Sequence, residues 1–339
     1  MYRLCTIFGS CHMVVTHGRI ELRHKTQRVC QADETGKHHE QPDRLFGMKK
    51  REIKNYGRSV KDRLLTVSIE SGIPYMTILV RYIQERLLYR LAQSEYCNNF
   101  FLKGGALLYA FNQEKARPTK DIDFLGTHIS NDSDYIKSIF SQIMAVPCEK
   151  DGIMFDKDSI VIEDITQDKE YHGLRLTVLA LLDSVRQSIS MDIGFGDVVT
   201  PGPQDLQYPL LLEDVPGMNV LAYSLETVVA EKFEAMVSLS VNNSRMKDFF
   251  DVYGIINGGK LDKDVLTDAI KNTFHHRGTS YVENHPLFTD DFYKDTTRIA
   301  RWRGFLKGIK WQEDIPFETI GQTIKSELLD YWEMLKPEQ

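Results

Sequence analysis

The chain has 339 residues, 42% of them hydrophobic, and a net charge of −6 from 42 lysines and arginines against 48 acidic residues. This length can bury one large core or two moderate ones, and the mild acidity excludes a generally basic nucleic-acid coat. The sequence contains no run of about 18 apolar residues, so we expect no membrane span and a soluble protein.

The first 47 residues show little helical or strand periodicity and lack the features of a secretory signal, so we expect an unstructured extension. Met48 opens a lysine-rich segment and is an alternative start of translation. The five cysteines form no CxxC pair, which indicates a reducing, cytoplasmic context. We expect no zinc site in the extension, because its candidate ligands match no tetrahedral pattern: Cys5, Cys11, His12, His17 and Cys30.

Two helices are predicted next. The first starts at Ser59, in a Ser-x-x-acid pattern, and ends at Gly72; the second starts near Pro74 and continues its apolar period to Leu91. Further elements are expected as a strand over 100–103, a helix over 106–111, a strand over 120–125, a helix over 132–145, and strands over 159–165, 171–182 and 187–193. The last three strands predict an antiparallel meander.

A connection rich in proline and glycine, residues 201–217, precedes a mainly helical half. We therefore expect three parts: the extension 1–47, a core over 48–217, and a helical subdomain over 218–339. The expected fold class is α+β, with a mixed sheet, flanking helices and a mainly helical C-terminal half.

Three aspartates are the strongest candidates for chemistry. Asp121 and Asp123 are two positions apart on a predicted strand, so their carboxylates point to the same face. Asp192 lies on a later strand among apolar neighbours, where an unpaired carboxylate is costly. Clustered carboxylates repel unless a cation compensates, and a trio of this kind serves phosphoryl transfer with bound Mg²⁺. Asp197, after Gly196, is interpreted as a turn residue.

These residues resemble a known family. Leu102-Lys103-Gly104-Gly105, a spacer, and Lys120-Asp121-Ile122-Asp123-Phe124 are similar to the glycine turn and D-x-D signature of the polymerase-beta-like nucleotidyltransferase superfamily. The segment from Glu231-Lys232 to Lys247-Asp248 narrows the resemblance to the AbiEii/AbiGii group, toxins of type IV toxin–antitoxin systems in abortive infection. The resemblance covers about residues 55 to 260.

The resemblance implies a function and a set of residues. It implies Mg²⁺-dependent transfer of nucleotides from a nucleoside triphosphate to tRNA acceptor ends, and a cognate antitoxin that acts without stable binding. The implied nucleotide-binding residues are Lys103, Gly104 and Gly105. Asp121, Asp123 and Asp192 are the expected metal ligands, and the expected catalytic set adds Lys232, Lys247 and Asp248 to them.

Several alternatives stay open at this point. Ala106 stands where many relatives have Ser or Thr, so a catalytically silent nucleotide-binding protein is one alternative function. Transfer of the nucleotidyl or phosphoryl group onto a protein hydroxyl is another. Arg117, in the spacer, either reaches a phosphate or caps the loop. Residues 294–311 interleave basic and aromatic side chains, which suits RNA binding, but an amphipathic helix with buried aromatics is the favoured interpretation.

Overall fold

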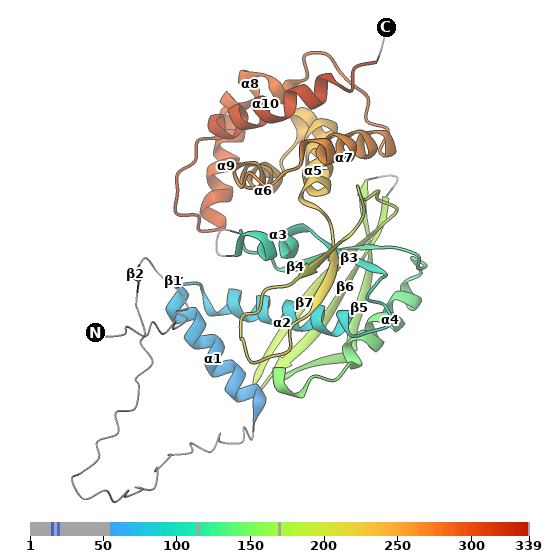
Figure 1. Ribbon diagram of the computed structural model, residues 1–339, viewed down its shortest axis with the longest axis vertical. Coiled ribbons are helices and arrows are strands. Elements are labelled where there is room, and N and C mark those ends of the chain that lie inside the picture. The colour runs from blue at the N-terminus through green and yellow to red at the C-terminus, as the bar shows by residue number, and fades with distance from the viewer. Residues whose placement is uncertain (1–14, 17–18, 21–54, 114–115, 169–170, 338–339) are drawn as a thin grey trace, which may run out of the picture. The chain divides into compact units, whose positions relative to one another are not determined.

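The computed structural model describes residues 15–16, 19–20, 55–113, 116–168 and 171–337 (Figure 1). The chain forms two units, residues 1–52 and 53–339. In the first, β1 (Val15–Thr16) pairs antiparallel with β2 (Arg19–Ile20). Otherwise the expected unstructured extension and its cysteines and histidines lie outside the described residues. Within the described ranges, no helix has the length and apolar character needed to cross a membrane.

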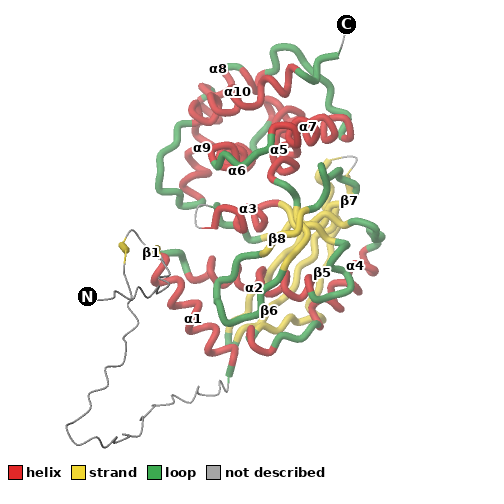
Figure 2. Tube along the Cα trace, viewed as in Figure 1, coloured by secondary structure: helices red, strands yellow, loops and turns green. Residues whose placement is uncertain are grey.

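The second unit combines a seven-stranded sheet with helices (Figures 1 and 2). Its strands are β3 (Phe100–Lys103), β4 (Asp121–Gly126), β5 (Ile153–Asp168), β6 (Tyr171–Leu182), β7 (Val185–Phe195), β8 (Gln204–Gln207) and β9 (Asn219–Ala222). Its α-helices are α1 (Tyr56–Ser71), α2 (Tyr75–Ala92), α3 (Gly104–Asn112), α4 (Ser133–Ala145), α5 (Leu225–Leu239), α6 (Met246–Asn257), α7 (Lys263–His276), α8 (Asp290–Lys294), α9 (Thr296–Gly308) and α10 (Phe317–Glu333).

The strand order is β5-β6-β7-β4-β3-β9-β8. Strands β5, β6 and β7 form the predicted antiparallel meander. β4 lies parallel to β7 and antiparallel to β3, and β3 lies parallel to β9, so the sheet is mixed. The expected fold class is therefore confirmed.

Alternation along the strands separates the two faces of the sheet. On β4, Ile122 and Phe124 are fully buried, and Phe124 packs with Phe100 of β3 and Phe140 of α4 at ring distances of 5.9 and 6.3 Å. Asp121 and Asp123 alternate with these apolar residues and therefore lie on the other face. The packed face anchors the strands, which leaves the opposite face to carry polar side chains.

The helical half has a core that is continuous with that of the sheet. Phe250 of α6 packs on Trp302 of α9 and on Trp311, with ring centroids 6.3 and 4.9 Å apart. Residues 53–339 form one compact unit, which contains both the expected core and the expected helical subdomain. The subdomain boundary near residue 217 therefore stays a prediction.

Several element boundaries differ from the sequence-based expectation, and three of the differences have a clear physical reason. α1 begins at Tyr56, because the Asn55 side chain caps it by accepting from the Arg58 amide at 2.9 Å. α3 begins directly after β3, at Gly104, because the positive φ of this glycine, 67°, lets the chain turn from the strand into the helix within one residue. β5 spans residues 153–168, and its register shift between Asp156 and Val161 interrupts the alternation that a sequence pattern relies on.

Candidate active site

The glycine turn between β3 and α3 lies against the acidic strand. Lys103 pairs in register with Asp123, and a Cβ on Gly104 would overlap the Asp123 carboxylate. A Cβ on Gly105 would lie 2.7 Å from Cβ of Thr119, which precedes β4. Both positions therefore require glycine, for the close approach of the turn to β4 and, at Gly104, for its backbone conformation.

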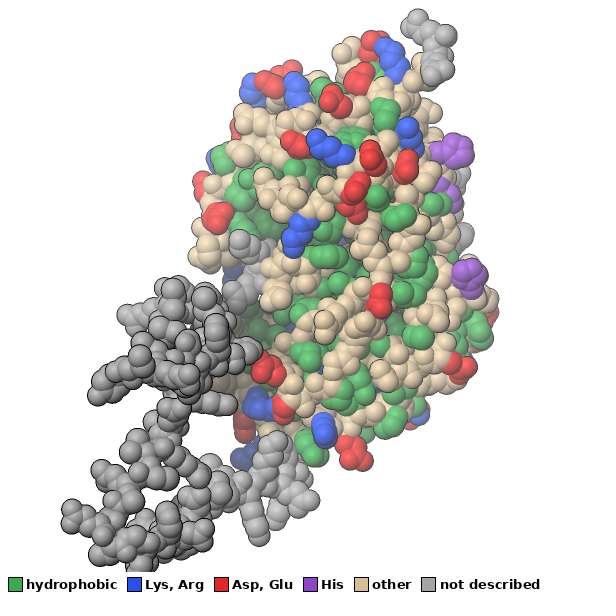
Figure 3. All heavy atoms as spheres, in the orientation of Figure 1, with side chains coloured by type: hydrophobic (Ala, Val, Ile, Leu, Met, Phe, Trp, Pro, Cys, Tyr) green, Lys and Arg blue, Asp and Glu red, His purple; other side chains and the backbone are tan. Residues whose placement is uncertain are grey.

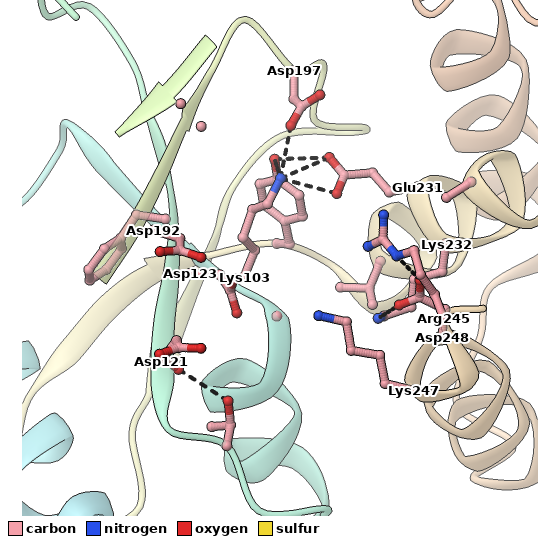
Figure 4. Close-up of a pocket in the computed structure, with 18 of the residues that line it drawn as sticks. Lys103, Asp121, Asp123, Asp192, Asp197, Glu231, Lys232, Arg245, Lys247 and Asp248 are labelled. Atoms are coloured by element: carbon pink, nitrogen blue, oxygen red, sulfur yellow. Dashed lines mark hydrogen bonds and ion pairs between the residues drawn. The ribbon is translucent and has the colours of Figure 1, made fainter. Parts of the chain in front are cut away.

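The three candidate aspartates come together at one face of the sheet. β4 and β7 are parallel, and their register places Asp123 opposite Asp192 and Asp121 two residues away (Figure 4). All three line a cavity of about 1180 Å³, together with residues of the helical half. The structure thus brings the predicted trio together on neighbouring strands.

Burial makes negative charge costly on this face of the sheet. Burial raises the pKa of Asp121, and the Asp192 carboxylate raises it further against the influence of Arg175 and Lys247. Burial likewise raises the pKa of Asp123, although Lys103 and Lys247 oppose the shift. Both carboxylates therefore hold their charge at a cost, which a bound cation would relieve.

Asp192 is already paired. Arg175, its cross-strand neighbour on β6, donates from Nε to Oδ1 at 2.7 Å and from Nη2 to Oδ2 at 2.6 Å. Among the residues that the structure describes, no three acidic, histidine or cysteine side chains converge into a preformed metal cluster. The donor chemistry still fits Mg²⁺, because carboxylate oxygens are its preferred protein ligands and those of Asp121 and Asp123 face the cavity.

Lys103 lies in a buried ion-pair network. Its Nζ is 2.8 Å from Asp197 Oδ2 and 3.1 Å from Glu231 Oε2, while Arg277 contacts the same two acids at 3.0 and 3.5 Å. Burial disfavours the Lys103 ammonium, but Glu231 and Asp197 outweigh it and raise its pKa. The Lys103 amine therefore forms ion pairs with two carboxylates of the protein. Asp197 lies in the loop after β7, as expected of a turn residue, and its carboxylate also joins Lys103 of β3 to Arg277 at the end of α7.

The predicted residues of the helical half form a second network. Lys232 of α5 contacts Asp248 at 2.6 Å and Asp251 at 2.9 Å, and Arg245 contacts Asp248 at 2.7 Å. Burial would raise the pKa of Asp248, but Lys232 and Arg245 lower it below its ordinary value. The two acids also outweigh burial at Lys232 and raise its pKa. Asp248 is fully buried, so it serves to orient these cations.

Arg117 and Lys247 have different places around the cavity. Arg117 forms a bidentate pair with Asp251, at 2.8 Å from Nε and 2.9 Å from Nη2, and so fixes the spacer before β4 to α6. Lys247 is exposed, and Figure 4 shows it pointing from α6 toward Asp121 and Asp123. The open question about Arg117 is answered for this structure: it anchors its loop to a helix.

The aromatic side chains of α9 belong to the core. Trp302 is 1% exposed and its Nε1 donates to the Ile315 carbonyl at 2.6 Å, and Phe305 packs on Phe250. A base-stacking role for these rings is therefore excluded, and the favoured amphipathic helix is confirmed. Exposed Arg301, Arg303 and Lys307 remain on its outer surface.

Sequence comparison identifies the family. The model of the nucleotidyl transferase AbiEii toxin of type IV toxin–antitoxin systems matches residues 86–323. Two solved structures from Helicobacter pylori, a candidate nucleotidyltransferase and JHP933, are each 15% identical with a TM-score of 0.45; they cover 78% and 77% of this chain and 97% and 94% of their own. No curated protein matches. Since the family match spans more than half of the chain, this protein belongs to the AbiEii family of type IV nucleotidyltransferase toxins.

Proposed function

We propose that the protein uses Mg²⁺ to transfer a nucleotidyl group from a nucleoside triphosphate to the 3′ hydroxyl of a tRNA acceptor end. The observation that carries this proposal is the row of three carboxylates on β4 and β7, facing Lys247 across one cavity. The acceptor and an antitoxin that acts without stable binding come from the family assignment.

Asp121 and Asp123 would hold the Mg²⁺, and Asp192 would complete its carboxylate ligands. When bound, the ion neutralises phosphate oxygens and makes the attacking hydroxyl more acidic. The raised pKa values of Asp121 and Asp123 support this role, because burial makes their charge costly and the nearby basic side chains do not fully offset that cost.

Basic and backbone groups around the carboxylates would hold the triphosphate. Lys247 supplies a positive charge from α6, and Lys232 and Arg245 are held near it by Asp248. The first turn of α3 begins at Gly104, which lines the cavity, and the free backbone N–H groups of this turn, including that of Gly105, would donate hydrogen bonds to phosphate oxygens.

The transfer itself forms one bond and breaks one. The acceptor hydroxyl oxygen bonds to the α-phosphorus, the bond from that phosphorus to the oxygen bridging the β-phosphate breaks, and pyrophosphate leaves. The hydroxyl proton passes to water in the open cavity. The chain contributes by placing both reactants and by neutralising the charge that develops on the phosphate oxygens.

The outer surface of α9 supports a polyanionic acceptor. Arg301, Arg303 and Lys307 are exposed there, and the end of this helix, at Gly308 and Ile309, lines the cavity. On the face shown in Figure 3, basic and acidic side chains are intermingled, so the net charge alone does not attract RNA there. This arrangement favours a local RNA grip beside the active site.

The proposal is tested by incubating purified protein with nucleoside triphosphates labelled at the α- or the γ-phosphate, together with total RNA or lysate protein. We expect label on RNA from the α-phosphate only, and none with Asp121→Asn or with EDTA. Asp205→Asn, on the exposed strand β8, is the matched control and should leave transfer unchanged. Label on protein would favour transfer onto a protein hydroxyl, and nucleotide binding without any label would favour a silent binding protein.

A further inference from the structure

Arg175 is a charged residue of the cavity to which the family resemblance assigned no role. It lies on β6 opposite Asp192 in the register of the sheet, and its side chain is 40% exposed. Its two hydrogen bonds to Asp192, at 2.7 and 2.6 Å, engage both carboxylate oxygens. A bidentate arginine is the strongest counter-ion that a protein side chain offers a carboxylate.

The three aspartates are therefore unequal. Asp192 has a fixed positive partner, whereas the described part of the chain directs no hydrogen bond or ion pair to the carboxylate of Asp121 or Asp123. A cation that uses all three acids must share Asp192 with Arg175 or displace it. Sharing places a guanidinium beside a divalent ion, and this repulsion weakens cation binding.

We propose that Arg175 is a competing counter-ion for the metal site: it neutralises Asp192 in the resting protein, leaves when a divalent cation binds, and then contacts the phosphates of the nucleotide. This inference rests on the proposed function, since it concerns the same site. It predicts that Arg175 weakens cation binding before nucleotide is present and strengthens nucleotide binding afterwards.

The surroundings give Arg175 room to move. It lines the cavity, and Gly194, the next residue after Asp192 on the same face of β7, has no side chain. A Cβ added at Gly194 would lie 3.9 Å from its nearest neighbours, which is an ordinary van der Waals distance, so the backbone at this position does not crowd the ion pair. The guanidinium stays charged at any ordinary pH, which makes this exchange a competition between cations and independent of titration.

The test measures Mn²⁺ binding in the absence of nucleotide, by calorimetry or by the electron paramagnetic resonance signal of free Mn²⁺. We expect Arg175→Gln to bind Mn²⁺ about tenfold more tightly than wild type. Arg186→Gln, an exposed arginine of β7 outside the cavity, is the matched control and should bind Mn²⁺ as wild type does. Asp192→Asn combined with Arg175→Gln should abolish the gain, because the gain requires the freed carboxylate.

A second measurement concerns the nucleotide. Arg175→Gln should raise the KM for the nucleoside triphosphate while Mn²⁺ binding improves, a divergence that a loss of folding would not produce. Arg175→Lys keeps the charge but loses the bidentate geometry, so its Mn²⁺ affinity and its KM should lie between those of the wild type and Arg175→Gln. This variant provides the test if Arg175→Gln is unstable.

Unchanged or weaker Mn²⁺ binding in the folded Arg175 variants would overturn the inference. This outcome is distinct from failure of the proposed function. A wild-type protein that binds Mn²⁺ and nucleotide but labels no acceptor would contradict transfer and leave the competition at Asp192 intact.

Discussion

Replacing Asp123 by asparagine should stabilise the metal-free protein at neutral pH. Asp123 is held beside Asp192 by the parallel register of β4 and β7, and burial raises its pKa. Asparagine has nearly the same shape, so it keeps the close packing against Gly104 while removing the charge. A site that is built to bind a cation is destabilised by its carboxylate charges when the cation is absent.

The magnitude follows from the geometry. Neighbouring strands are about 5 Å apart, and two unit charges at that separation repel by about 3 kcal/mol at an effective dielectric constant of about 20. Lys103 and Lys247 offset this repulsion, so the cost that remains comes mainly from the burial of the charged carboxylate. We therefore expect Asp123→Asn to raise the free energy of unfolding by about 1 to 2 kcal/mol, which is about 1 to 3 °C in Tm for a chain of this size.

The stability difference between Asp123→Asn and the wild type depends on pH. An ordinary aspartate has a pKa of 3.8, and the folded value for Asp123 is higher, so the folded state keeps its proton where the unfolded state has lost it. The stability of the wild type therefore falls as pH rises from about 4 through the raised pKa, relative to the variant, which cannot ionise. The gain of Asp123→Asn should be full at pH 7 and should shrink toward pH 4.

Thermal unfolding in EDTA, followed by circular dichroism at pH 4 to 8, measures this effect. Mg²⁺ should then stabilise the wild type and leave Asp123→Asn unchanged, and Asp205→Asn should behave as the wild type. A variant that is less stable than the wild type at pH 7 in EDTA would refute the reasoning, because it would show that the carboxylate makes net favourable contacts without a cation.

Three further predictions concern neighbouring parts of the site. Gly104→Ala should lower stability by at least about 1 kcal/mol and abolish transfer, because its Cβ meets Asp123 and its φ is positive; thermal unfolding and the labelling assay measure both. Arg117→Ala should cost about 2 to 3 kcal/mol in denaturant unfolding, since Asp251 loses its two hydrogen bonds to Arg117 and keeps only Lys232 as a buried partner. Lys247→Ala should reduce kcat about 100-fold, because the proposed role of this exposed side chain is to neutralise charge on the triphosphate, and it should lower Tm only slightly, because Lys247 offsets part of the cost of the Asp123 charge; an unchanged kcat would exclude Lys247 from the catalytic set.

The acidic face of the sheet was predictable because strands alternate. The two-residue spacing of Asp121 and Asp123 fixes a common face, and the predicted meander supplies Asp192 from another strand. The Arg175–Asp192 pair was also within reach of the sequence. Arg175 lies eight residues before Asp183 and Asp192 eight residues after Ser184, the two residues of the predicted turn, so the hairpin register pairs them.

The ion-pair networks were beyond the reach of sequence patterns. Lys103 meets Glu231 across 128 residues, and Arg117 meets Asp251 across 134, because the helical half packs against the sheet. No local periodicity carries information about such contacts, which depend on the docking of two layers. For the same reason Lys103 was expected to contact nucleotide, although in the folded chain acids surround its amine.

The most direct test of the proposed activity is to sequence tRNA 3′ ends after induced expression of the wild type, Asp121→Asn and Asp205→Asn at matched protein levels. We predict growth arrest and extra 3′ nucleotides on tRNA with the wild type and Asp205→Asn, and normal growth with unmodified ends for Asp121→Asn. Growth arrest with unmodified tRNA ends, or modified ends that persist in Asp121→Asn, would contradict metal-dependent nucleotidyl transfer to tRNA by this site.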